Sequence, residues 1–170
     1  THETAGGFGR PLGETLAVAE EAVQAVAGRE AAELLVVSRG DSPVVDETPA
    51  LFDAVLHGRV AYRFVDGASA ALFPPHRAVA LLAPGSGADA SLYGALPAEE
   101  LPGGYTLLHL DGSWPAAAFS PISGPGTFEN GIQLQGYRRQ GTAEPGGQME
   151  LWLLWQVLWL TPDDTHFFVH

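Results

Sequence analysis

Apolar positions recur at helical spacing in two segments of the first half of the chain. From Glu14 to Ala27 the sequence is rich in alanine and glutamate, its larger apolar residues are spaced three or four apart, and Gly28 follows as a stop signal. A second segment begins at Thr48-Pro49, because threonine can cap free amides and proline fits the first helical position, and it ends at Gly58. The pattern predicts one helix in each segment.

Short apolar runs closed by turn residues alternate with these helices. The runs have the leucine-rich, β-branched or aromatic composition of strands, and they lie at 34–38, 60–65, 78–83 and 105–110. Residues 70–73 could add a short hairpin strand, and Asp89 could cap a short helix through Leu96. Strands alternating with helices predict a small α/β unit of the Rossmann-like, three-layer kind with a largely parallel sheet.

The periodic pattern breaks down after Asp111, where glycine, proline, serine and alanine dominate. Beyond this stretch three runs read as consecutive antiparallel strands, at 131–139, 148–157 and 165–170. The last run stops at His170 without a closing element, so we expect an incomplete β-sandwich-like module whose open edges could pair two chains into a homodimer. We therefore divide the chain into a leader, an α/β domain, a linker and a truncated antiparallel β module, at 1–13, 14–111, 112–126 and 127–170.

The composition excludes several kinds of chemistry. All eight basic residues are arginines against twenty acidic residues, which gives a net charge of −12 and makes nucleic acid an unfavourable partner. The absence of lysine removes Schiff-base catalysis and the phosphate-binding lysine of a Walker loop, and the absence of cysteine removes thiol chemistry and disulfides. No targeting signal precedes the first helix, and the most apolar run, 151–160, is about half the length of a membrane helix.

The Gly85-Ser86-Gly87 turn is the one place that resembles a nucleotide site. Backbone amides between a strand and a helix could cradle a phosphate, which would fit a small nucleotide-dependent α/β enzyme. The turn lacks the third glycine of the dinucleotide fingerprint and any GKS or GKT, and Asp89 stands where an anion would approach. A plain strand-to-helix turn is therefore the favoured interpretation.

Other candidate groups have ordinary structural interpretations. The adjacent acids Asp46 and Glu47 precede a helix, and the pair Asp163-Asp164 lies in a turn, so neither pair forms a catalytic dyad across a cleft. The histidines at 166 and 170 would be roughly 13 Å apart in an extended strand, too far to share a metal ion. We expect no metal, no cofactor and no catalytic residue in this segment.

Aromatic and charged motifs leave one alternative open. Four tryptophans could form a sugar-stacking platform of a free carbohydrate-binding module, and they lie at positions 114, 152, 155 and 159. The tripeptide Arg39-Gly40-Asp41 matches the integrin motif and equally an ordinary turn at the end of a strand, which we favour.

A family resemblance adds to this picture. The stretch from Val36 to Ala50, continuing through 60–67 and 81–85, resembles the soluble C-terminal region of bacterial polytopic glycosyltransferases of the protein mannosyltransferase and aminoarabinose transferase type. Residues 130–137, 145–147, 154–155 and 166–170 resemble the β-sandwich module that follows in such proteins, although the family usually has Trp-Arg where this chain has Trp155-Gln156.

The resemblance implies a non-catalytic accessory region in the periplasm or at the cell surface. Its partner would be the membrane-embedded part of the parent transferase, and it would position a glycan or an acceptor. Ligands of α/β folds bind beyond the carboxyl ends of the strands, here near 39–46 and 84–89. The candidate ligand-binding residues are therefore Arg39, Asp41, Asp46, Glu47, Ser86 and Asp89.

Overall fold

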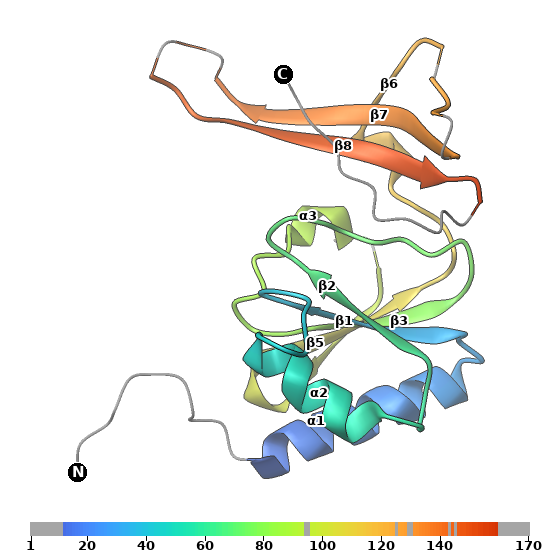
Figure 1. The fold of residues 1–170 in the computed structure, drawn as a ribbon, viewed down its shortest axis with the longest axis vertical. Helices are drawn as coiled ribbons and strands as arrows, with labels where there is room; N and C mark the ends of the chain where they lie inside the picture. The colour runs from blue at the N-terminus through green and yellow to red at the C-terminus, as the bar shows by residue number, and fades with distance from the viewer. Residues whose placement is uncertain are drawn as a thin grey trace. The chain divides into compact units, whose positions relative to one another are not determined.

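The chain divides into two compact units, Thr1–Trp114 and Pro115–His170. The fold is known from a computed structural model, which describes residues 12–93, 96–124, 126–128, 131–142, 144 and 146–159. Each unit is described by itself below (Figure 1).

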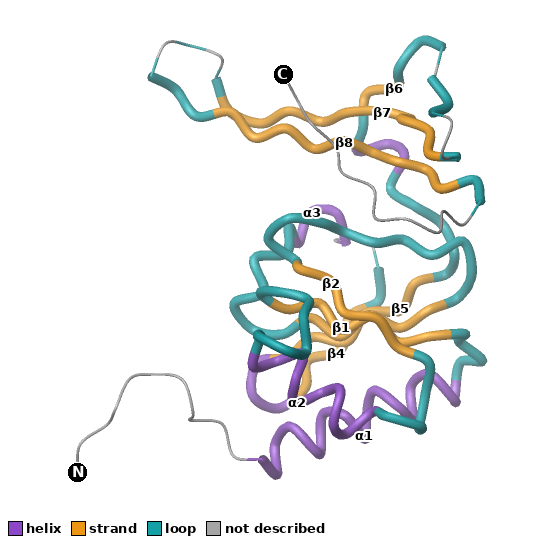
Figure 2. Tube along the Cα trace, in the orientation of Figure 1, coloured by secondary structure: helices purple, strands orange, loops and turns teal. Residues whose placement is uncertain are grey.

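The first unit is built on a mixed sheet of five strands in the order β2-β1-β3-β5-β4. The strands are β1 (Glu33–Ser38), β2 (Tyr62–Asp66), β3 (Ala78–Leu82), β4 (Ala98–Leu101) and β5 (Tyr105–Leu110). β1 pairs in parallel with both β2 and β3, whereas β5 runs antiparallel to β3 and to β4. The α/β class is confirmed, but the sheet is mixed and only its β2-β1-β3 half is parallel. Figure 2 shows the strands of this sheet in orange and the helices in purple.

Two helices share one hydrophobic core on one face of this sheet. Helix α1 (Leu12–Gly28) and helix α2 (Glu47–Leu56) both match predicted helices, and each buries an apolar stripe. The ring of Phe52 is fully buried and meets Tyr105 of β5 edge to face, with the ring centroids 5.8 Å apart. The cluster unites α1, α2 and the sheet through Val18, Ala19, Ala22, Val26, Phe52, Leu56, Leu34, Val36, Val79, Leu81 and Leu107.

Among the described elements, no long helix covers the opposite face of the sheet, yet this face is buried. Alternate residues such as Leu35, Ala80 and Leu108 face this way and are buried. Figure 1 shows the single-turn helix α3 (Ala90–Tyr93) on this side, opposite α1 and α2. The side chain of Tyr93 is buried, and its ring centroid lies 5.3 Å from that of Phe73 in the loop before β3. The specific three-layer, Rossmann-like description is therefore not confirmed.

Several local predictions differ from the structure. Residues 70–73 form no strand, and the predicted helix from Asp89 is reduced to α3 in the described residues. Strand β4 was missed because its sequence, Ala-Glu-Glu-Leu, lacks β-branched and aromatic residues; pairing with β5 overrides that weak propensity. The turn between the two strands uses Gly103 and Gly104, both at positive φ.

The second unit is a three-stranded antiparallel sheet in the order β6-β7-β8. Its strands are β6 (Ser120–Pro121), β7 (Ile132–Gly141) and β8 (Met149–Val157), with an irregularity in register between Leu134 and Gly136. The long strands correspond to the predicted runs 131–139 and 148–157, while the run 165–170 lies outside the described residues. The predicted linker 112–126 contains β6 and a 3-10 turn, Ala116–Ala118.

In the parts of the chain that the structure describes, no helix combines the length and apolar character needed to cross a bilayer.

Candidate functional site

Three loops meet where the parallel strands β1, β2 and β3 end. The backbone N–H of Gly67, after β2, donates to the carbonyl of Ser38 at 2.8 Å, and the N–H of Ala83, after β3, donates to the carbonyl of Val37 at 2.8 Å. A Cβ on Gly87 would lie 3.0 Å from the Cβ of Ala68. We call the segments 39–46, 67–70 and 83–89 the carboxyl-edge loops.

Asp66, the last residue of β2, ties two of these loops together. Its Oδ1 accepts hydrogen bonds from the backbone N–H of Gly40 at 3.1 Å and of Ala68 at 3.2 Å, and its Oδ2 accepts one from the Ser69 hydroxyl at 2.9 Å. The bond from Gly40, the bond from Ser69 and the positive charge of Arg39 hold the pKa of Asp66 below its usual value. Asp66 is therefore an ionised anchor for the loop backbone.

Asp46 plays a similar part inside the first loop. Its Oδ2 accepts a hydrogen bond from the backbone N–H of Ser42 at 3.0 Å, and its carboxylate packs on Gly40. Gly40 has φ +82°, and a Cβ there would lie 2.3 Å from the Asp46 carboxyl carbon. Asp46 occupies the N-cap position of α2 without a side-chain capping bond, so the helix starts before the predicted Thr48.

The six predicted ligand-binding residues lie on or beside these loops. The side chains of Arg39, Asp41 and Glu47 are exposed, those of Asp46 and Asp89 are half-buried, and that of Ser86 is buried. Asp66 was missed as a site residue. A signal was present in the Asp-Gly pair that closes its strand, because a neighbouring parallel strand must end at the same edge of the sheet.

The Gly85-Ser86-Gly87 turn is stabilised by a local hydrogen bond between its serine side chain and the backbone that follows. Gly85 and Gly87 have φ +73° and +77°, and the Ser86 hydroxyl accepts a hydrogen bond from the N–H of Ala88 at 3.4 Å. Because α3 is a single turn, it offers little of the aligned backbone dipole that a phosphate site exploits.

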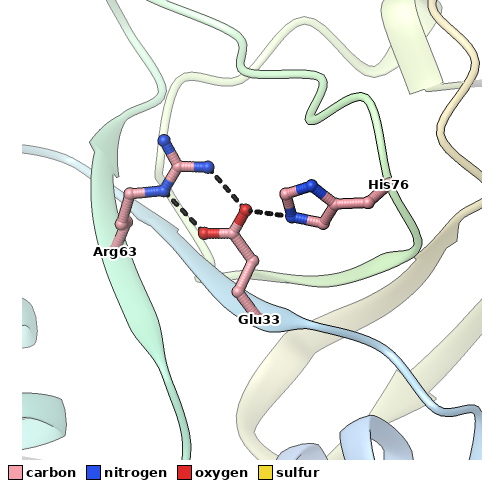
Figure 3. A network of polar contacts seen from close by, with 3 residues as sticks. All are labelled: Glu33, Arg63 and His76. Carbon is pink, nitrogen blue, oxygen red and sulfur yellow. Dashed lines mark hydrogen bonds and ion pairs between the residues drawn. The ribbon is translucent and has the colours of Figure 1, made fainter. Parts of the chain in front are cut away.

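A second polar cluster surrounds Glu33, the first residue of β1 (Figure 3). Arg63 of β2 donates from Nε to Oε2 at 2.6 Å and from Nη2 to Oε1 at 2.5 Å, and Nε2 of His76 lies 2.8 Å from Oε1. Burial alone would raise the pKa of Glu33, but the bonds to Arg63 and His76 outweigh it and lower that pKa. The cluster is a structural ion pair, which the sequence analysis missed.

The remaining sequence candidates are acidic pairs, histidines and tryptophans. The pair Asp163-Asp164 and the histidines at 166 and 170 lie outside the described residues. Within the described ranges, no group of three or more histidine, aspartate or glutamate side chains is arranged to hold a metal ion. Trp155 contacts Phe128 with ring centroids 5.9 Å apart, and the side chain of Trp159 is 54% exposed.

Comparison of the chain with protein-family models, with curated proteins and with solved structures finds no match. The fold and site on their own define a mixed α/β unit with a polar loop edge, followed by a small antiparallel sheet.

Proposed function

We propose that this chain is a non-catalytic accessory region of a membrane glycosyltransferase, and that the carboxyl-edge loops of its first unit position a glycan or an acceptor. The observation that carries the proposal is that two carboxylates at this edge, those of Asp46 and Asp66, bind the backbone of the loops. Asp46 and Asp66 both accept hydrogen bonds from loop backbone, so their oxygens organise the loops. Carboxylates used in this way suit a preformed recognition surface better than acid or base catalysis.

The exposed side chains beside these anchors supply recognition groups. Arg39 offers a fork of donors, and Asp41 and Glu47 offer paired acceptors. Hydroxyl groups both donate and accept, so a polyhydroxylated ligand can use groups of both kinds. Loops held by Asp46 and Asp66 would present these side chains with little loss of conformational entropy on binding.

The family resemblance supplies the setting of this proposal. The residues that carry it, 36–50, 60–67 and 81–85, include much of the carboxyl-edge loops. In this setting the chain is extracytoplasmic, its partner is the membrane-embedded part of the parent transferase, and the Rossmann-like and sandwich descriptions of the two units stay predictions.

A titration followed by nuclear magnetic resonance tests the binding step. The labelled chain is titrated with free glycans and with sugar nucleotides, and amide shifts are mapped on the sequence. We expect saturable shifts confined to 39–46, 67–70 and 83–89, weakened in Arg39→Gln and unchanged in the control Arg138→Gln on β7. The absence of any shift would remove the proposal. Shifts produced only by the nucleotide part would favour the enzyme alternative, and shifts of the tryptophan indoles would favour the carbohydrate-binding module.

The second unit supports one further element of the proposal, a homodimer formed through sheet edges. Among the described strands, β8 pairs only with β7, and the proposal is that its other edge pairs with a strand from another chain. Light scattering over a wide concentration range should then show a dimer, and a monomer at every concentration would contradict this element.

A further inference from the structure

A cavity of about 320 Å³ lies between the second half of α1 and the strand pair β4 and β5. Its polar lining consists of Glu21, Gln24, Arg29, Glu99 and His109. Its apolar lining comes from Ala25, Leu101 and Leu107, which are residues at the edge of the core shared by α1 and the sheet. The volume lies at the small end of the range for ligand pockets.

His109 points an unsatisfied nitrogen into buried surroundings. Its Nδ1 is inaccessible to solvent and has no hydrogen-bond partner among the described residues. Burial lowers the pKa of His109, the positive charge of Arg29 lowers it further, and Glu99 acts in the opposite direction. The lowered pKa favours the neutral imidazole, so the charges of the cavity lining come from Glu21, Arg29 and Glu99.

The charged side chains around the cavity are of both signs and are not paired with one another. Within the described residues, the side chains of Glu21, Arg29 and Glu99 form no salt bridge and no hydrogen bond with another side chain. Arg29 and Glu99 line the same cavity as His109. A ligand that fills the space between them would be bound best if it carried one positive and one negative group.

We propose that this cavity binds a small zwitterion of the size of a free amino acid. Arg29 binds the carboxylate through its planar fork, and Glu99 accepts hydrogen bonds from the ammonium. The ligand side chain lies on Leu101 and Leu107. This site is distinct from the carboxyl-edge loops, and it does not depend on the function proposed for them.

The test is calorimetric titration of the chain with each of the standard amino acids, and with glucose as an uncharged probe, up to about 10 mM. We expect at least one amino acid to bind, and Arg29→Gln and Glu99→Gln each to weaken it about tenfold, the effect of losing one charge-assisted hydrogen bond. Both residues have exposed side chains, so both variants should fold. The ring resonances of His109 should shift with the same saturation curve.

A matched control comes from the next residue of the same strand. Glu100 faces the other side of β4 and accepts a hydrogen bond from the Thr106 hydroxyl at 3.2 Å, so Glu100→Gln should leave the affinity unchanged. Three results would overturn the proposal: no amino acid binds, an amino acid binds equally to Arg29→Gln and Glu99→Gln, or glucose binds and no amino acid does.

Discussion

Replacing Glu33 by glutamine tests whether the partly buried ion pair at the start of β1 stabilises the first unit. The Glu33 side chain is 11% exposed, while those of Arg63 and His76 are 50% and 45% exposed. Glutamine keeps the size and one acceptor oxygen, but it loses the negative charge and the bidentate match to the guanidinium of Arg63. The substitution therefore isolates the charge of a single side chain.

The magnitude follows from the bonds that change. Hydrogen bonds to charged groups contribute about 1.5 to 3 kcal/mol each when desolvated, and Glu33 makes three. Solvent around the half-exposed partners offsets much of this sum, and glutamine still accepts one bond. We expect Glu33→Gln to lower the free energy of unfolding by about 2 kcal/mol, which lowers the melting temperature of a unit of this size by about 8 to 16 °C.

Urea denaturation followed by far-ultraviolet circular dichroism measures this loss, because α1 and α2 are the longest helices in the described part of the chain. The matched control is Glu20→Gln, which removes the exposed ion pair between Glu20 and Arg59. That variant should change stability barely at all, since exposed pairs are screened by solvent. A loss in Glu33→Gln no larger than that in Glu20→Gln would refute the reasoning.

The pH dependence of the same variant has a defined sign. The folded-state pKa of Glu33 is lowered from 4.5, so its contribution to stability is complete above pH 4.5 and is lost as the pH falls through the folded-state pKa. Below pH 4.5 the unfolding free energy of Glu33→Gln should therefore fall less steeply with pH than that of the parent chain. Parallel curves would contradict the assignment.

Two further substitutions test the loop edge and the core. Gly40→Ala should lower the free energy of unfolding, measured by urea denaturation, by about 2 to 4 kcal/mol, because it combines positive φ with a clash against Asp46. The control Gly58→Ala, at φ +72° with nothing within 4 Å, should lower it by only about 1 to 2 kcal/mol. Equal losses in the two variants would contradict the clash. Phe52→Ala should cost about 3 to 5 kcal/mol by leaving a cavity beside Tyr105, and a loss below about 1 kcal/mol would show that this core contact is wrongly placed.

The elements that the sequence predicted are those whose signal is local. Helices α1 and α2 and the buried strands β1, β3 and β5 each combine an apolar pattern with a turn residue at the end. Strand β4 was not predicted because Glu99 and Glu100 have low strand propensity, and its pairing with β5 is a tertiary effect. Without β4 the alternation of helix and strand suggested a parallel sheet, although Pro102-Gly103-Gly104 is a hairpin signal.

The sequence predicted where the candidate site lies, but it did not predict the hydrogen bonds that hold the loops together. Strand ends located the loops that hold Arg39, Asp46 and Ser86 by the general rule for parallel strands. The bond from Gly40 to Asp66 spans 26 residues and exists only because β1 and β2 are neighbours in register. The order of the strands decides such contacts, and no local pattern encodes it.

The most direct test of the proposed function is a kinetic measurement on the full-length protein in membranes, comparing Arg39→Gln and Asp41→Asn with the parent and with the control Arg138→Gln. Because the carboxyl-edge loops are proposed to position the ligand without taking part in the chemistry, each loop variant should raise KM for the glycan or acceptor about tenfold and leave kcat nearly unchanged. The control should match the parent. Loss of kcat with unchanged KM, or no sugar transfer by the parent protein, would contradict the account.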